Sequence, residues 1–304
     1  MSNNKVPFTK PHLSFSAQLE KLKERGLIVA NEETAIRCLS NINYYRLGTY
    51  WWSFEKSHDD HTFNPGSTFE QVLDLYIFDR ELRLLLLDAI ERIEVALRTQ
   101  WAYYLGLEEG GPHAHMNPDN FKSIKHFNHD QMKASLVQEA KRSKDKHIQQ
   151  KLHKYEEEAP AIWISCEAMS FGLLSKAYEL IKKNHVKNRI AEHFLLKEKT
   201  LKSFLHHIVI VRNICAHHSR LWNRDFTIEF TLPNKMDSAY KSSFNCQKPK
   251  KIYNTLVMLI YILDNIAPNN TWSYRVKQLF EKHPNISLAH MGFPNDWLVR
   301  GAWS

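Results

Sequence analysis

The residues best suited to chemistry lie in one short segment, residues 212–218 (RNICAHH), directly after an apolar run. A histidine can take up or release a proton near neutral pH, because the pKa of a free imidazole is about 6.5. An arginine offers a planar guanidinium that matches two phosphate oxygens. These groups suit RNA cleavage, in which the 2′-hydroxyl attacks the adjacent phosphate, protons are transferred and a cation stabilises the developing charge.

The spacing within this segment sets a geometric condition. On an α-helix, Asn213 and His217 are four positions apart and share one face. Arg212 and His217 are five positions apart, about 140° around an ideal helix. Their side chains meet only if the long arginine curls around the helix or the helix ends there. We therefore expect a helix end or a distortion near His217, or a second chain that completes the site.

The cleavage needs two proton transfers, which sets a second condition on the histidines. One histidine supplies only one of the two proton transfers, so a symmetric dimer that brings two copies of the segment together would supply the other. Either His217 or His218 could be the acting residue. A purely structural interpretation competes with this one, because an arginine and two histidines at a helix end more often form an ion pair and helix-terminal cations.

The apolar run before this segment has the period of a helix that faces a core. Its stripe consists of Leu201, Leu205, Ile208, Val211 and Cys215. A helix that is apolar on nearly all sides belongs in the middle of a bundle. The polar residues that follow it therefore start from a buried position, where they need partners.

A second long amphipathic helix is predicted over residues 70–105. Its polar side carries Glu91, Glu94 and Arg98, and the last two are spaced for an i, i+4 ion pair. Two interpretations are open. The pair is either a solvated salt bridge worth a few tenths of a kcal/mol, or part of a face that meets Arg212 and orients it.

The overall composition predicts an all-α protein. The 304 residues are 43% hydrophobic and 24% charged, and they include only nine glycines. No alternating strand pattern recurs, which argues against sandwiches, barrels and Rossmann sheets. We expect a helical bundle built from residues 70–105, 160–183, 197–220 and 250–267. The expected organisation is an N-terminal helical region, residues 1–68, packed on a helical domain, residues 69–304, with a charged helical insertion near residues 112–158.

Charge, cysteine usage and hydropathy limit the partners and the compartment. The net charge of +8 favours a polyanionic partner. Four scattered cysteines without a C-x-x-C pair fit a reducing, cytoplasmic setting. No apolar stretch reaches the roughly 18 residues that a membrane span needs, so we expect no membrane partner.

Several further residues are candidates for contacts with RNA. The aromatic and basic residues of one segment could stack on unpaired bases, although an aromatic core is the commoner role. Three basic residues of a polar helix could contact phosphates, although a solvated face is commoner. The candidates are Tyr44, Tyr45, Arg46, Trp51, Lys141, Arg142, Lys144, Arg220 and Arg224.

A histidine pair offers the one candidate metal site. His113 and His115 lie in a predicted loop, but no carboxylate or cysteine follows at a convincing spacing. We therefore predict no metal and no cofactor. A metal-dependent nuclease that uses this loop remains a rival hypothesis.

Blocks spread from about residue 13 to residue 297 resemble the Abi D/F-type abortive-infection family. They include NINYYRLGTY, YIFDRELRLLLLDAIERIEVALR, AIWISCEAMSFGLLS, VRNICAHHSRLWNR and MGFPNDW. Within them, RNICAH matches the R-x(4–6)-H motif of HEPN domains. The resemblance implies a HEPN-type bundle in an anti-phage toxin, and HEPN proteins are commonly metal-independent endoribonucleases that act as homodimers.

The same resemblance assigns roles to the residues of the motif. It implies Arg212 and His217 as the catalytic pair with Asn213 assisting, while His218 also fits the spacing. We expect Glu91, Glu94 and Arg98 to support this pair from the neighbouring helix. Some similar proteins are paired with a small structured RNA that restrains them, which makes such an RNA a candidate partner beside the RNA substrate. The main rival is a non-catalytic RNA-binding or scaffold protein in which Arg212 is a structural ion-pair partner.

Overall fold

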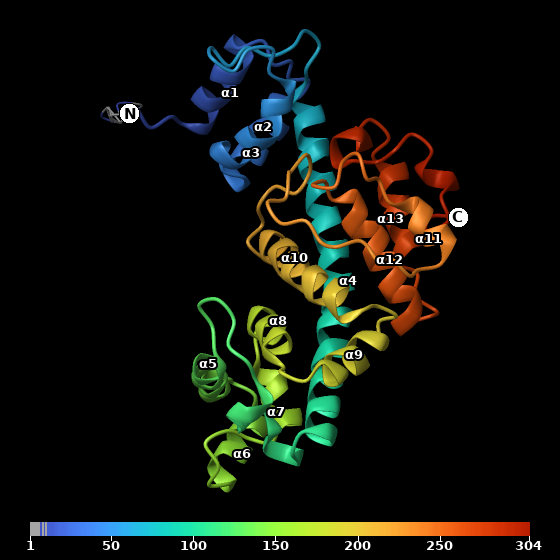
Figure 1. Cartoon of the computed structure of the whole chain (residues 1–304). Coiled ribbons are helices and arrows are strands. Elements are labelled where there is room, and N and C mark those ends of the chain that lie inside the picture. Colours follow the sequence, from blue (N-terminus) through green and yellow to red (C-terminus); the bar gives the residue numbers. More distant parts are fainter. Residues whose placement is uncertain (1–6, 8, 10) are drawn as a thin grey trace. The chain divides into compact units, whose positions relative to one another are not determined.

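The computed structural model describes residues 7, 9 and 11–304 (Figure 1). The start of the predicted N-terminal region, residues 1–6, 8 and 10, lies outside the described residues. Every regular element in the described part is a helix, and extended segments meet only in isolated bridges. The all-α prediction is therefore confirmed.

The chain divides into two compact units, residues 1–81 and 82–304, with the boundary inside helix α4, Phe69–Glu108. The predicted boundary at residues 68 and 69, and the packing of the N-terminal region on the bundle, stay predictions. Each unit is described by itself below.

The first unit contains α1 (Phe15–Glu24), α2 (Glu32–Asn41), α3 (Tyr44–Trp51), η1 (Trp52–Phe54) and the start of α4. Side-chain caps begin α1, α2 and α3. The Ser14 hydroxyl accepts from Ala17 N–H at 3.2 Å, and the side-chain oxygens of Asn31 and Asn43 accept from Thr34 N–H and Tyr45 N–H, both at 2.8 Å. The buried Tyr50 hydroxyl donates to the carboxylate of Asp79 at 2.8 Å. This bond joins α3 to α4 within the unit.

The second unit continues α4 and adds a series of shorter helices. In chain order they are η2 (Gly111–Met116), η3 (Pro118–Asn120), α5 (His129–Arg142), α6 (Lys146–Lys154), α7 (Ile162–Ala168), α8 (Phe171–Leu180), α9 (Asn184–Glu192), α10 (Glu198–Ala216), α11 (Ser238–Ser243), α12 (Tyr253–Ile266), α13 (Trp272–Lys282), η4 (Leu288–Met291) and η5 (Trp297–Val299). The predicted insertion near residues 112–158 is thus helical.

Two helices form the centre of this unit. Residues 253–263 of α12 are all buried, and so is the entire predicted stripe of α10. Buried His207 links the two helices, because its ring nitrogens bond to the Ile228 carbonyl at 2.7 Å and the Thr255 hydroxyl at 2.9 Å. Polar contacts also tie α13 to α4, since the Trp272 indole N–H donates to the Leu85 carbonyl at 2.7 Å. The predicted central position of α10 is confirmed.

The prediction of a single helix over residues 160–183 is wrong, because the structure has two helices there. α7 ends before Met169, and Ser170 begins α8 by accepting from Leu173 N–H. The Ser170 N–H donates to the carboxylate of Glu139 in α5 at 2.7 Å. This contact stabilises the break between α7 and α8. The break exposes the Met169 carbonyl as an acceptor for a side chain of α4.

The aromatic C-terminal tail docks on the core, as its composition predicts. The ring of Phe293 lies 4.7 Å from that of Tyr253 in α12 and 5.2 Å from that of Phe280 in α13. Trp303 is 1% exposed and lies edge-on to Trp297 at 5.0 Å. Edge-to-face aromatic contacts therefore close this end of the second unit.

Buried neutral histidines predict acid sensitivity. Burial, helped by His113 and His129, lowers the pKa of His115 to about 4, and burial lowers the pKa of His207 to about 4. Between about pH 6.5 and 4 the unfolded chain therefore binds protons that the folded chain does not, so stability is lost as the pH falls. Each histidine should lower the free energy of unfolding by about 2 kcal/mol between pH 7 and 5.

Urea unfolding at the two pH values measures this loss. The His207→Gln protein should show a smaller difference between pH 7 and 5 than the parent. The matched control is His153→Gln, which changes an exposed histidine of α6 and should keep the full difference. Equal pH dependence in all three proteins would contradict the prediction.

Candidate active site

The end of α10 lies within the predicted motif. The helix ends at Ala216, and His217 is its C-terminal cap with φ −88° and ψ 11°. The His217 N–H still bonds to the Asn213 carbonyl at 2.9 Å, while His218 turns into the left-handed region with φ 55°. The expected helix end near His217 is therefore confirmed.

The turn that follows is a Schellman motif. The His218 N–H donates to the Cys215 carbonyl at 3.1 Å, and the Ser219 N–H donates to the Ile214 carbonyl at 3.0 Å. Glycine is the usual residue at the left-handed position of this motif, and a side chain there costs about 1 kcal/mol or more. His218 holds that conformation, so the surrounding contacts must fix the turn.

One such contact comes from a residue that sequence reasoning missed. Arg83 of α4 is only 4% exposed, and its guanidinium donates to the Ser219 carbonyl at 3.4 Å. The sequence hinted at its burial, because Arg83 lies next to Leu82 and three positions before Leu86, and both leucines are buried. Its partner could not be read from the sequence, because 136 positions separate the two residues.

The arginine of the motif is drawn toward the histidine side of the helix. The Arg212 guanidinium donates to the side-chain oxygen of Asn213 at 3.2 Å. Asn213 shares its face with His217, and both are exposed, whereas Arg212 is half-buried. The guanidinium of Arg212 therefore reaches toward the face of α10 that carries Asn213.

An ion pair of α4 stands beside this arginine. The Arg98 guanidinium and the Glu94 carboxylate are 2.5 Å apart, and the two side chains are only 16% and 13% exposed. Arg98 also donates to the Met169 carbonyl at 2.8 Å, at the break between α7 and α8. The pair is therefore anchored rather than solvated.

The charge of Arg212 acts on the same carboxylate. Burial raises the pKa of the Glu94 carboxyl. The negative charges of Glu91 and Glu167 also raise this pKa, whereas the positive charges of Arg98 and Arg212 lower it. The opposing effect of Arg212 on the pKa of Glu94 is consistent with the interpretation in which this face meets Arg212. Sequence reasoning missed Glu167, which lies in α7 and becomes a neighbour only through folding.

The aromatic candidates for RNA contact divide into buried and exposed residues. Trp51 is 4% exposed and packs edge-on against Tyr44 at 4.7 Å, and the Tyr44 hydroxyl accepts from Arg25 at 3.1 Å. A stacking role for Trp51 is wrong, because its ring belongs to the core of the first unit. Tyr45 is 84% exposed and offers its ring to solvent.

The basic candidates lie on separate elements. Lys141 and Arg142 end α5 and Lys144 follows it, and all three are exposed. Arg220 and Arg224 follow α10 and are half-buried, with the Arg224 side chain donating to the Arg220 carbonyl at 2.8 Å. Arg46 is exposed in α3 of the first unit. The sequence alone could not show whether these residues share one surface.

The histidine loop is packed inside the second unit. His115 is fully buried, and its ring centroid lies 6.1 Å from that of His113 and 6.4 Å from that of Trp101. Across residues 7, 9 and 11–304, no group of three or more histidine, cysteine or acidic residues is arranged to hold a metal ion. In the same part of the chain, no helix has the length and apolar character that crossing a bilayer requires.

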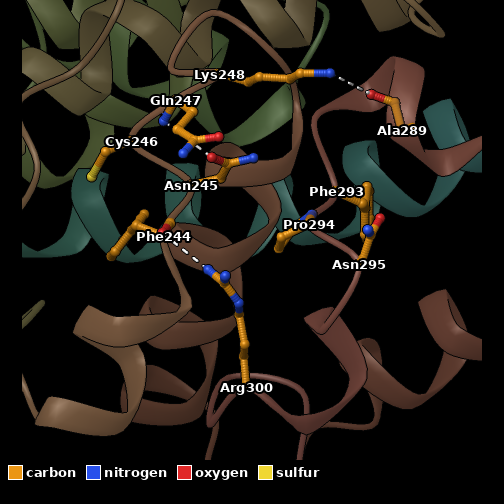
Figure 2. Close-up of a pocket in the computed structure, with 10 residues that line it drawn as sticks. All are labelled: Phe244, Asn245, Cys246, Gln247, Lys248, Ala289, Phe293, Pro294, Asn295 and Arg300. Atoms are coloured by element: carbon orange, nitrogen blue, oxygen red, sulfur yellow. Dashed lines mark hydrogen bonds between the residues drawn. The ribbon is translucent and has the colours of Figure 1, made fainter.

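A separate cavity of about 470 Å³ lies beside the C-terminal tail (Figure 2). Arg300 donates from one side to the carbonyls of Ser242, Ser243 and Phe244 at 3.2 to 3.3 Å. Lys248 donates to the Ala289 carbonyl at 3.4 Å. These cations hold loops together, and none of the predicted catalytic residues lines the cavity.

Comparisons with known proteins give one family. No curated protein and no solved structure matches the chain. The model of a family described as Abi-like protein matches residues 37–223, which is more than half of the 304 residues. The match includes the second half of α2, all of α3 and α4, and the whole motif at the end of α10. The chain therefore belongs to the Abi-like protein family.

Proposed function

We propose that this Abi-like protein is a metal-independent endoribonuclease with a HEPN-type site, acting as a toxin in abortive infection. Family membership supports a role in abortive infection, the defence in which phage-infected bacterial cells stop growing. The observation that carries the nuclease proposal is the contact of Arg212 with Asn213 at the point where α10 ends on His217.

The proposed reaction is transfer of the phosphate to the 2′-oxygen. That oxygen forms a bond to phosphorus, and the bond to the 5′-oxygen breaks, leaving a 2′,3′-cyclic phosphate and a 5′-hydroxyl. His217 either removes the proton from the 2′-hydroxyl or delivers one to the 5′-oxygen. Arg212 pairs with the non-bridging oxygens and stabilises their developing charge.

The neighbouring residues position the arginine. Asn213 accepts from the guanidinium, which fixes its direction. The anchored Glu94–Arg98 pair supplies the electrostatic surroundings of Arg212, and Glu91 adds negative charge to them. A guanidinium held before the substrate arrives loses little freedom when the phosphate binds.

A homodimer would supply the second proton transfer. His206, Asn213 and His217 lie along the exposed face of α10, beside the half-buried Val209 and Ile210. A symmetric contact between two such faces would bring two copies of the motif together. Sedimentation at the assay concentration tests this, since an active enzyme that is strictly monomeric would contradict it.

A small structured RNA is the proposed restraint on the toxin. The net charge of +8 supports binding of a polyanion. Purification without nuclease treatment should recover a defined RNA with the protein. Recovery of only heterogeneous RNA, released at moderate salt, would contradict a specific partner.

Substitution of the two proposed catalytic residues tests the nuclease directly. Arg212→Lys keeps a positive charge near Glu94 but loses the planar fork, and His217→Gln removes the proton transfer. Each change should lower the rate of RNA cleavage in excess chelator by roughly 100-fold or more. The rate is measured on a labelled RNA, with thermal unfolding as the check on folding.

The matched control is His218→Asn. Asparagine tolerates the left-handed conformation of His218, so the turn should survive, and the cleavage rate should stay close to that of the parent. If His218→Asn is inactive while His217→Gln is active, the roles are exchanged. If folded Arg212→Lys and His217→Gln proteins cut RNA as fast as the parent, the assignment of these two residues as catalytic is overturned. If the parent binds RNA and leaves it intact, the rival scaffold function is correct.

A further inference from the structure

The segment from the end of α5 through α6 carries much of the positive charge of the chain. Residues 141–155 contain six lysines and arginines and one acidic residue, Asp145. The net charge of this segment is +5, with histidines neutral, against +8 for the whole chain. Lys151 is half-buried and the other five cations are exposed, namely Lys141, Arg142, Lys144, Lys146 and Lys154. Such a concentration of accessible charge attracts a polyanion.

Side-chain contacts fix the turn between the two helices that carry these cations. The Gln149 amide of α6 donates to the carbonyls of Ala140 and Ser143 at 3.0 and 2.8 Å, at the end of α5. The Asp145 carboxylate begins α6 by accepting from the His147 N–H at 2.7 Å. The cations before and after the turn are therefore held on one surface of the second unit, the α6 surface, residues 141–155.

An exposed aromatic ring lies at the end of the α6 surface. Tyr155 directly follows α6 and is 50% exposed. The ammonium groups of Lys154 and Lys151 lie 5.4 and 5.9 Å from the centre of its ring. An aromatic ring flanked by cations can stack on an unpaired base while the cations pair with the adjoining phosphates.

Helix-end electrostatics and ion pairing do not account for these cations. Lys151 and Lys154 lie in the last turn of α6, where the helix dipole favours a cation, but Lys146 lies in the first turn, where the dipole disfavours one. Within the described residues, none of the six cations has a carboxylate at ion-pair distance, and nearby Glu158 pairs with Lys133 at 2.6 Å. The six cations are thus available to phosphate oxygens.

The apolar side of α6 is used inside the protein. Ile148 is 5% exposed and Leu152 is half-buried, and these are the two apolar residues of the helix. An amphipathic helix that binds a bilayer inserts an exposed apolar face between the headgroups. The α6 surface therefore suits a nucleic acid better than an anionic membrane.

We propose that the α6 surface binds single-stranded RNA, with an unpaired base stacked on Tyr155 and the neighbouring phosphates paired with the cations. The choice of RNA rests on the proposed function. Glu156 and Glu157 follow Tyr155 and are exposed. They repel phosphates on that side, so the strand runs from Tyr155 back along α6 toward the end of α5.

Binding of a labelled single-stranded 2′-O-methyl RNA to the full-length protein tests this site. The methyl group prevents attack by the 2′-oxygen, so the probe stays intact whether or not the protein is a nuclease. Lys154→Gln should weaken binding a few-fold and reduce the slope of log affinity against log salt by about 0.7, the value for one lost phosphate contact. Tyr155→Leu should weaken binding about 10-fold with the slope unchanged, because stacking releases no counterions.

Matched variants and a second probe control for indirect effects. Lys241→Gln and Tyr274→Leu change an exposed lysine of α11 and an exposed tyrosine of α13 and should alter neither quantity. Tyr155→Trp keeps an aromatic ring and should restore the affinity that Tyr155→Leu loses. A duplex of the same sequence should bind equally to the parent and to Tyr155→Leu, because its bases are already stacked.

Three outcomes would overturn the proposal. If Lys154→Gln and Tyr155→Leu both bind the probe as the parent does, the α6 surface is not an RNA site. If only Lys154→Gln weakens binding, Tyr155 does not stack and the assignment to single strands is wrong. If both changes spare RNA binding but abolish binding to vesicles of equal parts phosphatidylcholine and phosphatidylserine, the α6 surface binds membranes instead.

Two further measurements distinguish the source of the RNA strand. If the site takes the substrate, Tyr155→Leu should raise the KM for RNA cleavage and leave kcat unchanged. If the site takes the restraining RNA, the same variant should lose the RNA that is purified with the parent and keep the parent's KM.

The binding readout keeps this inference distinct from the nuclease proposal. A protein that binds the probe through Tyr155 but never cuts natural RNA would contradict the nuclease and leave this site in place. A protein that cuts RNA, and whose affinity for the probe is the same in Tyr155→Leu and Lys154→Gln, would do the reverse.

Discussion

The termination of α10 directly after its buried stripe is the constraint on which the rest of the candidate site depends. The burial of Val211 and Cys215 fixes the rotation of the helix up to its last turn. The helix must then stop within two residues, and it does so through a left-handed His218. Because the apolar stripe and the stop are so close, Arg212 is half-buried while His217 is exposed at the helix end. One helix end thereby presents a directed cation and an accessible imidazole together.

Side chains of α4 contribute polar contacts to this end of α10. Arg83 holds the turn, and the Glu94–Arg98 pair lies beside Arg212. Arg98 in turn depends on the Met169 carbonyl, which is available only because α7 and α8 are separate helices. A break that weakens a helix thus provides the acceptor that anchors the charged residues.

The sequence was sufficient for features that depend on local periodicity. The stripe of α10 follows from spacing and residue type, and the helix end near His217 is one of the alternatives that helix geometry predicts. The break at Ser170 was missed because serine is both a tolerable helix residue and a good cap, and the choice between them depended on Glu139. Burial of Trp51 was left open because an aromatic segment suits either a core or a stacking surface. The roles of Arg83 and Glu167 required tertiary contacts that no spacing encodes.

The chemistry of the RNA ends tests the central claim most directly. The claim is that Arg212 and His217 cleave RNA by attack of the 2′-hydroxyl without a metal ion. Purified protein should cut RNA in excess chelator, and the products should carry 2′,3′-cyclic phosphates at one end and 5′-hydroxyls at the other. Products with 3′-hydroxyls and 5′-phosphates, or RNA that is bound and left intact in chelator, would contradict the account.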